Sequence, residues 1–340
     1  MQAIQAIRAM EAVNLLPQPR RRKVYNQRAN PIEDLPDIEF RRRYRFDKET
    51  VQFIIQLVRA DLTKDRRGAS LTPELQVLTA IRCWGRKEDL TLHADKTIHF
   101  RSKMMLQSFT GSRSRHNAAE REETCRRFYA LRAFPTIIGC IDCTHIKIKK
   151  CGGSAAQYYI NRKGYYSLNV QVTCDADLKI QDIVARWRGS THDARIFNEC
   201  SLKERFEAGE FRGKRLLGDS GYKLEPYLLT PVLRAQSASE ERYNTAHIAT
   251  RNTVERCFGV WKARFRCLLQ GMTVKLQNVK TTVIALAVLH NIAIMHNDLV
   301  PEADEDGADE EEADEEVVVA AVSRAANNAH LRAFIHRHFQ

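Results

Sequence analysis

The sequence lacks the features that would place the chain in or across a membrane. No stretch resembles a secretory leader, and the longest apolar run, TTVIALAVLHNIAIM at residues 281–295, is shorter than the roughly 20 residues that a membrane span needs. That run also contains the polar residues His290 and Asn291. We therefore expect a core helix of a soluble protein there, and no contact of the chain with a membrane.

A paired cysteine pattern is also missing. The nine cysteines are odd in number and scattered through otherwise ordinary segments, which suits a reducing compartment better than a disulfide framework. Cys140 and Cys143 form a C-x-x-C pair, but positions i and i+3 of a strand face opposite sides, and no second pair at ligand spacing follows. We interpret both as small core residues rather than zinc ligands.

Basic residues are absent from one segment and abundant elsewhere. Residues 302–316 hold 11 acids and no base, so a chain with a net charge of +12 carries +23 on all its other residues. This positive charge favours a polyanionic partner, with nucleic acid the leading candidate. The alternative is that the charge serves only general solubility. The acidic segment is typical of a solvated linker, and a second hypothesis is that it covers the basic DNA-binding face.

Composition and hydrophobic period divide the chain into five regions. The basic run from Arg20 to Lys23 indicates a nuclear import signal or a simple basic arm, so we expect the nucleus, with the cytoplasm as a second compartment. The regions are a basic, mostly disordered tail (1–36) whose first dozen residues could form a short helix, a helical module (37–131), a large domain (132–297), an acidic disordered linker (298–322) and a short C-terminal helix (323–340).

The order of elements in the large domain predicts an α/β fold. Period and turn signals predict three strands, a helix, a strand and a long helix: 137–148, 165–175, 180–190, 193–209, a strand within 215–222, and 240–269. A ribonuclease-H-like core requires this order, with a mixed sheet flanked by helices and acidic residues at the carboxyl ends of adjacent strands. We predict that core, preceded by the small helical module.

Asp142 stands within IIGCIDCTHIKIKK, a stretch that otherwise predicts a buried strand. A lone ionised carboxylate out of water costs several kcal/mol unless a neighbour or a metal ion compensates it. Asp219 follows the next parallel-strand candidate and Glu255 lies on the long helix, so the three acids can converge. Carboxylates crowded together need divalent cations between them, and oxygen ligands favour Mg²⁺ or Mn²⁺. Taken alone, Glu255 is better interpreted as a solvated ion pair with Arg251, one turn earlier.

Five motifs give the domain a family resemblance. In order they are IDCTHI, YYINRKGYYSLNVQ, GSTHDARIF, GDSGY and RNTVERCFGVWKARF, between about residues 132 and 297. This set resembles the PIF/Harbinger transposases and the Harbinger transposase-derived nucleases. The resemblance implies a DDE triad of Asp142, Asp219 and Glu255, with 35 residues (220–254) between the last two, and Asp193 as a further metal ligand. Without it, Asp193 would be interpreted as a helix-start residue.

The resemblance also implies a separate Myb/SANT-like DNA-binding partner. Many relatives have a helix-turn-helix where this chain has residues 85–109, and none can be recognised in this segment. Cys143 stands where many relatives have glycine. Dependence on a partner for DNA binding and for nuclear entry would fit the missing motif.

Basic and aromatic residues around these motifs are candidate DNA contacts. Tyrosines alternate with bases in 158–166, a mixture that can stack on unpaired bases and hold phosphates, or form a hairpin whose tyrosines cover a sheet face. The candidate DNA-binding residues are Arg162, Lys163, Arg251, Lys262, Arg264 and Arg266. His145 and His192 are candidates for holding a carboxylate or the scissile phosphate, with a structural role as the alternative for each.

Two functions fit the sequence. The first is a metal-dependent DNA endonuclease of transposase descent, which uses a metal-activated water and can also perform strand transfer with a freed 3′ hydroxyl. The second is a catalytically silent DNA-binding or adaptor protein that acts through its partner. Both predict salt-sensitive DNA binding, and the sequence does not indicate an oligomeric state.

Overall fold

The computed structural model describes residues 30–62, 71–85, 117–150, 152–154, 156–298 and 324–340, the last segment with side chains from residue 329 on. The chain divides into two units, Met1–Leu35 and Pro36–Gln340. The described part of the first unit contains the four-residue helix α2 (Pro31–Asp34), whose start is capped because Asn30 accepts a hydrogen bond from Ile32 N–H. The helix considered for the first dozen residues lies outside the described residues.

The second unit contains the helical module and the large domain. Its elements in chain order are α3 (Asp37–Tyr44), α4 (Lys48–Leu62), α5 (Pro73–Gly85), α7 (Ala118–Arg132), β1 (Ile137–Lys147), η1 (Ala156–Tyr159), β2 (Ser167–Cys174), β3 (Ile180–Arg188), α8 (Asp193–Asn198), α9 (Ser201–Glu207), β4 (Arg215–Leu217), β5 (Leu228–Leu229), α10 (Ala238–Arg264), α11 (Cys267–Gln270), α12 (Leu276–Met295) and α13 (Arg324–His338).

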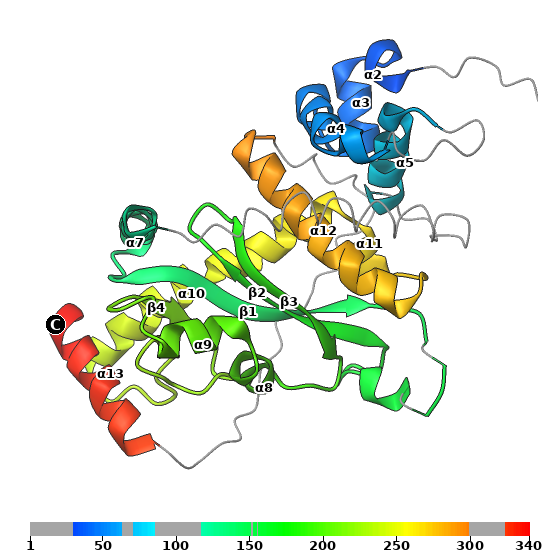
Figure 1. Cartoon of the computed structure of the whole chain (residues 1–340). Coiled ribbons are helices and arrows are strands. Elements are labelled where there is room, and N and C mark those ends of the chain that lie inside the picture. Colours follow the sequence, from blue (N-terminus) through cyan, green and yellow to red (C-terminus); the bar gives the residue numbers. More distant parts are fainter. Residues whose placement is uncertain (1–29, 63–70, 86–116, 151, 155, 299–323) are drawn as a thin grey trace, which may run out of the picture. The chain divides into compact units, whose positions relative to one another are not determined.

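A mixed sheet with strand order β3-β2-β1-β4-β5 forms the centre of the large domain (Figure 1). β2 pairs antiparallel with both β1 and β3, whereas β4 pairs with β1, and β5 with β4, in parallel. Every residue of β2 is buried, so both faces of the sheet are covered. This architecture confirms the predicted α/β, ribonuclease-H-like core preceded by a helical region.

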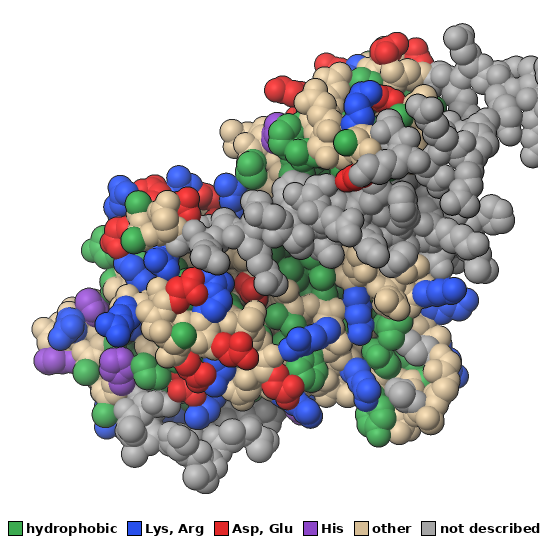
Figure 2. Space-filling model, in the orientation of Figure 1, with side chains coloured by type: hydrophobic (Ala, Val, Ile, Leu, Met, Phe, Trp, Pro, Cys, Tyr) green, Lys and Arg blue, Asp and Glu red, His purple; other side chains and the backbone are tan. Residues whose placement is uncertain are grey.

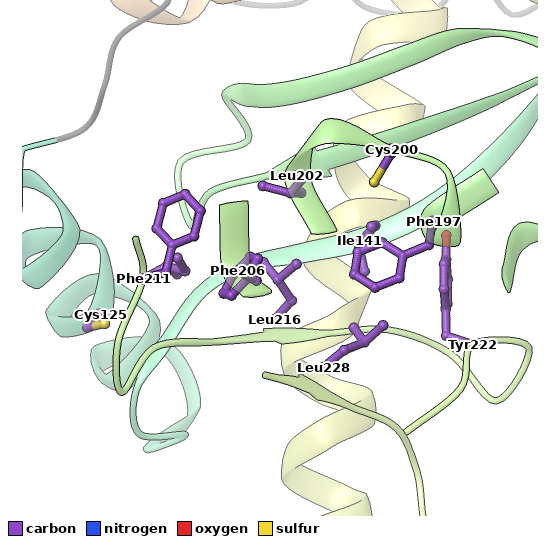
Figure 3. Close-up of a cluster of buried hydrophobic side chains, with 11 residues drawn as sticks. Cys125, Ile141, Phe197, Cys200, Leu202, Phe206, Phe211, Leu216, Tyr222 and Leu228 are labelled. Carbon is purple, nitrogen blue, oxygen red and sulfur yellow. The ribbon is translucent and has the colours of Figure 1, made fainter. Parts of the chain in front are cut away.

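Helices cover the two faces of the sheet (Figure 1). α8 and α9 lie on one face, where Ile141 of β1 and Leu216 of β4 pack with Phe197 in a buried apolar cluster (Figure 3). α10 and α12 lie on the other face. Cys125 of α7 belongs to the same cluster and α7 packs on β1, so this helix is part of the sheet domain. The predicted boundary at residue 132, which put α7 in the helical module, is therefore too late.

α12 is the long apolar helix expected from the sequence. By length and composition it could cross a membrane, but it packs on β3 and most of its apolar window is buried inside the protein. Val283 and Leu286 are fully buried. The prediction of a core helix is confirmed, because the sheet accounts for the apolar surface.

Other predicted elements differ in detail from those observed. The helix predicted for 193–209 is two short helices, α8 and α9, and the long helix predicted for 240–269 ends at Arg264. β5, with only two residues, has no counterpart in the prediction. Asp298, the first residue of the predicted linker, is buried within the fold, and residues 299–322 lie outside the described residues.

The C-terminal helix α13 lies within the region predicted for it. Phe334 and Phe339 pack with Phe134 and with Tyr243 of α10, at ring-centroid distances of 5.2 to 6.0 Å among the pairs Phe134–Phe334, Phe134–Phe339 and Tyr243–Phe339. Arg242 of α10 also donates to the carbonyl oxygen of Phe339. These contacts hold α13 on the N-terminal half of α10, away from Glu255.

Candidate active site

Asp142 lies in the middle of β1 with its carboxylate toward α10. Arg251 Nη1 is 3.1 Å from Asp142 Oδ2, and the N–H of Cys143 donates to Asp142 Oδ1 at 2.7 Å. Burial raises the pKa of Asp142 to about 7, against the opposing effects of Arg251 and the Cys143 N–H, and Asp193 and Glu255 raise it further by charge repulsion. Of the two compensations that the sequence allowed, the neighbouring charge is the one present here.

Glu255 reaches the same arginine from one turn further along α10. Arg251 Nη2 lies 2.6 Å from Glu255 Oε1, so one guanidinium bridges two of the predicted triad acids. The predicted ion pair of Glu255 with Arg251 therefore exists, but it lies against Asp142 rather than on a separate solvated face. The side chain of Glu255 is 49% exposed, whereas that of Asp142 is 16% exposed. The pair is thus open to solvent on one side.

Asp219 lies two residues after the end of β4, the strand that pairs in parallel with β1. β1 and β4 are parallel, with Cys140 opposite Leu217, and each aspartate comes two residues after its paired residue. The carboxyl ends of adjacent parallel strands meet at one edge of a sheet, so this register places the two backbones side by side. Asp219 Oδ1 accepts a hydrogen bond from the N–H of Gly221 at 3.2 Å, which shapes the turn after β4.

Asp193 begins α8, as expected for a helix-start residue, and a side chain of the sheet also holds its carboxylate. Asn169 Nδ2 of β2 donates to Asp193 Oδ1 at 2.8 Å and to the carbonyl oxygen of Thr191 at 2.9 Å. Asp193 is close enough to Asp142 to raise the pKa of that carboxyl group. The sequence argument missed Asn169. Its signal was a polar residue in a strand whose other positions are all buried.

Tyr222 and Cys143 form a contact beside the acids that sequence reasoning also missed. Tyr222 Oη lies 3.4 Å from Cys143 Sγ, and burial raises the pKa of both groups well above their ordinary values. The Tyr222 ring packs over Gly218, where an added Cβ would lie 2.9 Å from a ring carbon. The GDSGY motif therefore does more than make a turn: its glycine and tyrosine fit together under the loop that carries Asp219.

The two candidate histidines differ in their surroundings. His145 Nδ1 lies 3.0 Å from Ser167 Oγ across the β1–β2 pair, a contact that fits the structural alternative. His192 is exposed, and its Nδ1 lies 2.8 Å from Arg162 Nη2. Because His192 immediately precedes Asp193, this contact brings Arg162 to the border of the acidic group. A role for either histidine in holding a carboxylate or a phosphate stays a prediction.

The predicted DNA contacts divide by exposure. Arg162 and Lys163 are exposed and Arg266 is partly exposed. Arg264 is fully buried, where it donates to the carbonyl oxygens of Arg45 and Asp298, and Lys262 is 4% exposed. The prediction that Lys262 and Arg264 contact DNA is wrong, because a buried cation cannot reach a phosphate without unfolding its surroundings.

Exposed bases interleave with aromatic rings near η1. The Arg188 guanidinium lies 5.0 Å from the Tyr158 ring and 5.9 Å from the Tyr159 ring, and Lys147 Nζ lies 5.0 Å from the Tyr165 ring. Figure 2 shows basic and apolar side chains side by side at this end of the molecule. Ser190 fixes the turn after β3 to η1, because its N–H and hydroxyl both donate to the carbonyl oxygen of Tyr158.

The donor set suits a hard divalent cation, although its present arrangement is closed by Arg251. Within the described residues, no three His, Cys, Asp or Glu side chains are gathered closely enough to hold a metal ion. The four candidate ligands, Asp142, Asp193, Asp219 and Glu255, offer only carboxylate oxygens, the ligands that Mg²⁺ and Mn²⁺ prefer. The Arg251 guanidinium compensates two of these charges, as a cation at the same place would.

Comparisons with known proteins assign the chain to a class and a family. The sequence profile of a family described as "DDE superfamily endonuclease" matches residues 141–291, a range that includes all four acids. A protein named "Putative nuclease HARBI1" from Mus musculus is 30% identical over 298 residues, covering 78% of this chain and 80% of its own. The protein of the same name from Xenopus laevis is 30% identical over 290 residues, covering 80% and 83%.

A more distant relative is "Protein ALP1-like" from Arabidopsis thaliana, 23% identical over 285 residues, which cover 75% of this chain and 70% of the relative. No solved structure gives a significant match. The fold and the acids define a DDE-type protein. The chain belongs to the family of Harbinger transposase-derived nucleases, as the five sequence motifs predicted.

Proposed function

We propose that this protein is a metal-dependent DNA endonuclease of transposase descent. The observation that supports it most is the convergence of acids far apart in sequence: Asp142 and Glu255 share the guanidinium of Arg251, and Asp193 is close enough to Asp142 to raise its pKa. Asp219 follows β4, the strand that pairs in parallel with β1. A structural ion pair does not need further acids nearby, whereas hydrolysis of a phosphodiester by divalent cations does.

The carboxylates of Asp142, Asp219 and Glu255, with Asp193 beside them, would hold Mg²⁺ or Mn²⁺, which when bound activates water and neutralises charge on the phosphate. The side chains of this protein would orient that chemistry. The Cys143 N–H fixes one oxygen of Asp142, and Asn169 fixes one oxygen of Asp193. Tyr222, packed over Gly218, holds the turn of Asp219 and excludes water from the side of the sheet that faces α8.

DNA would approach over the surface around η1. Arg162 and Lys163 are exposed there and would contact phosphates, which positions the strand without reading its sequence. Tyr158, 48% exposed and held against Arg188, could stack on an unpaired base. Arg266 would extend the contacts along the far end of α10.

Strand transfer by a freed 3′ hydroxyl is a further part of the proposal, because the same carboxylates would serve an attacking hydroxyl as they serve water. A Myb/SANT-like DNA-binding partner and a location in the nucleus are proposed on the family resemblance. No helix-turn-helix can be recognised in the sequence of residues 85–109, which supports dependence on such a partner. All of this segment after Gly85 lies outside the described residues.

The alternative is a catalytically silent DNA-binding or adaptor protein. One observation favours it: Arg251 already pairs with Asp142 and with Glu255, so part of their charge is compensated without a metal cation. In that case the ion pairs would serve the fold alone. DNA binding would remain, since it depends on the exposed bases rather than on the acids.

Nicking of supercoiled plasmid by the purified full chain separates the two functions. We expect Mg²⁺- or Mn²⁺-dependent nicking that falls about 100-fold or more in Asp142→Asn and Glu255→Gln, because each substitution removes a charged ligand. Glu241→Gln, at an exposed acid on the same helix, is the matched control and should nick at the wild-type rate. Equal nicking by all four proteins would indicate a contaminating nuclease. If the partner is required, adding it should restore the difference between them.

A further inference from the structure

Arg251 has a position that neither a simple DNA contact nor a simple surface ion pair explains. Its Nη1 and Nη2 atoms contact two different acids: Nη1 lies 3.1 Å from Asp142 Oδ2, and Nη2 lies 2.6 Å from Glu255 Oε1. The two acids come from different elements, β1 and α10, and both belong to the proposed triad. Arg251 therefore occupies the position between them.

We propose that Arg251 is an internal counter-ion of the acidic site, which a divalent cation must displace before it binds, and which then becomes a phosphate contact. This inference rests on the proposed function and specifies how the site is loaded. Arg251 is thus a positioning residue: it acts on the metal ligands and, after its release, on the substrate.

The charges explain why displacement is favourable. Asp142, Glu255 and the neighbouring Asp193 carry up to three negative charges, against one positive charge on Arg251. A divalent cation compensates more of this charge than a guanidinium does. The guanidinium lies between Asp142 Oδ2 and Glu255 Oε1, so it and a metal cation shared by these two oxygens would compete for the same space and repel each other. Binding is therefore an exchange of partners.

The surroundings allow this exchange. Glu255 is about half exposed, and the Arg251 side chain is 18% exposed, so the guanidinium can turn toward solvent by changing its own rotamers. Arg264, on the same helix, shows the opposite case: its side chain is 1% exposed and its partner Asp298 is completely buried. The Arg251 bridge is the one that a ligand from solvent can open.

DNA gives the released arginine a new partner. A phosphate, like a carboxylate, accepts two parallel hydrogen bonds from a guanidinium. A DNA strand lying over the acids would therefore stabilise the displaced rotamer of Arg251. Metal and DNA would then each favour binding of the other, by the same factor in both directions. A protein built in this way would hold its metal weakly until DNA is present.

The test measures Mn²⁺ binding to the full chain at about pH 8.5. The electron paramagnetic resonance signal of free Mn²⁺ reports how much of the ion stays unbound. We expect Arg251→Gln to bind Mn²⁺ about tenfold more tightly than wild type, which corresponds to about 1.4 kcal/mol. The matched control is Arg256→Gln, which removes a positive charge from an exposed position on the same helix. It should change the dissociation constant by less than about twofold, because it does not touch the acids.

Two further arms keep the outcomes distinct. Arg251→Lys keeps the charge but lacks the planar fork of N–H groups that Arg251 directs at two acids. It should bind Mn²⁺ about threefold more tightly than wild type, and it serves if the glutamine variant fails to fold. Adding a short DNA duplex should tighten Mn²⁺ binding by wild type several-fold and by Arg251→Gln much less. Unchanged Mn²⁺ affinity in both Arg251 variants would overturn the inference.

That failure differs from failure of the proposed function. If Asp142→Asn binds Mn²⁺ as tightly as wild type, the acids are no metal site and the nuclease proposal itself is lost. If Asp142→Asn abolishes binding while both Arg251 variants bind as wild type does, the nuclease proposal stands and only the displacement of Arg251 is refuted.

Discussion

The helix α10 carries two arginines that hold buried carboxylates in different ways. Arg264, its last residue, lies 3.6 Å from the Asp298 carboxylate, donates to two backbone carbonyl oxygens and has no access to solvent. Arg251 bridges Asp142 and a half-exposed Glu255. Burial raises the pKa of Asp142 and of Asp298. The difference teaches that solvent access, rather than the ion pair itself, distinguishes a structural contact from a site able to exchange partners.

Removing Arg264 should have the largest effect on stability. Arg264→Ala removes the buried charge partner of Asp298, leaves it only the partly exposed Arg41, and removes the donor to two buried carbonyl oxygens. Breaking a buried pair in this way costs about 3 to 5 kcal/mol. Arg251→Gln should cost less than about 1 kcal/mol at neutral pH, because the half-exposed Glu255 can be solvated and Asp142, with a pKa of about 7, can take up a proton. Urea unfolding followed by circular dichroism measures both, with Arg256→Ala as the exposed control. Similar losses for Arg264→Ala and Arg251→Gln would contradict the comparison.

Asp142→Asn should stabilise the protein at alkaline pH, by about 2 kcal/mol at pH 8 in the presence of a chelator. The folded pKa of Asp142, about 7, lies above its ordinary value of 3.8, so the folded state holds a proton that the unfolded state releases between these values. The stability from this group is therefore complete below the unfolded pKa and is lost as the pH rises through 7. The asparagine variant avoids this loss.

Thermal unfolding of wild type and Asp142→Asn between about pH 4 and 8 measures this difference, which should narrow as the pH falls. Mn²⁺ serves as the control: it should stabilise wild type and leave the variant unchanged, because only wild type has the charged ligand. A variant that is less stable than wild type at every pH would show that the Arg251 bond outweighs the cost of burial.

Glu255→Gln should have the smallest effect on stability, below about 0.5 kcal/mol, because an ion pair with one half-exposed partner contributes little. Its loss of nicking activity should nevertheless be large. The free energy of unfolding from urea titration, compared with that of Glu241→Gln, checks this expectation. If Glu255→Gln lowers the free energy of unfolding by more than about 2 kcal/mol, Glu255 is a structural residue as Arg264 is.

The sequence predicted the sheet and the elements that carry the acids because the signals for these elements are local. The apolar run around Asp142, the GDSGY turn and the periodic helix around Glu255 each follow from nearby residues, and the fold they predict is the one observed. The two-residue strand β5 has too few residues for a periodic signal. The helix predicted for 193–209 breaks near Cys200, where burial of that side chain against the apolar cluster overrides helical propensity.

Contacts between distant segments escaped prediction. The sequence makes Lys262 and Arg264 candidate phosphate contacts, but Arg264 is enclosed by Arg45 and Asp298, which are remote in sequence. The bridge from Arg251 to Asp142 spans 109 positions and has no local signal either. Packing thus decides which basic residues face solvent, and their spacing in the sequence does not predict it.

The most direct measurement of the central claim is the anomalous scattering of Mn²⁺ in crystals of the full chain grown or soaked with that ion. We predict an anomalous peak coordinated by the carboxylates of Asp142 and Asp219, with Arg251 turned away from Asp142, and no peak in crystals of Asp142→Asn. A wild-type crystal in which Arg251 still bridges Asp142 and Glu255 at saturating Mn²⁺, with no metal at these carboxylates, would contradict the account.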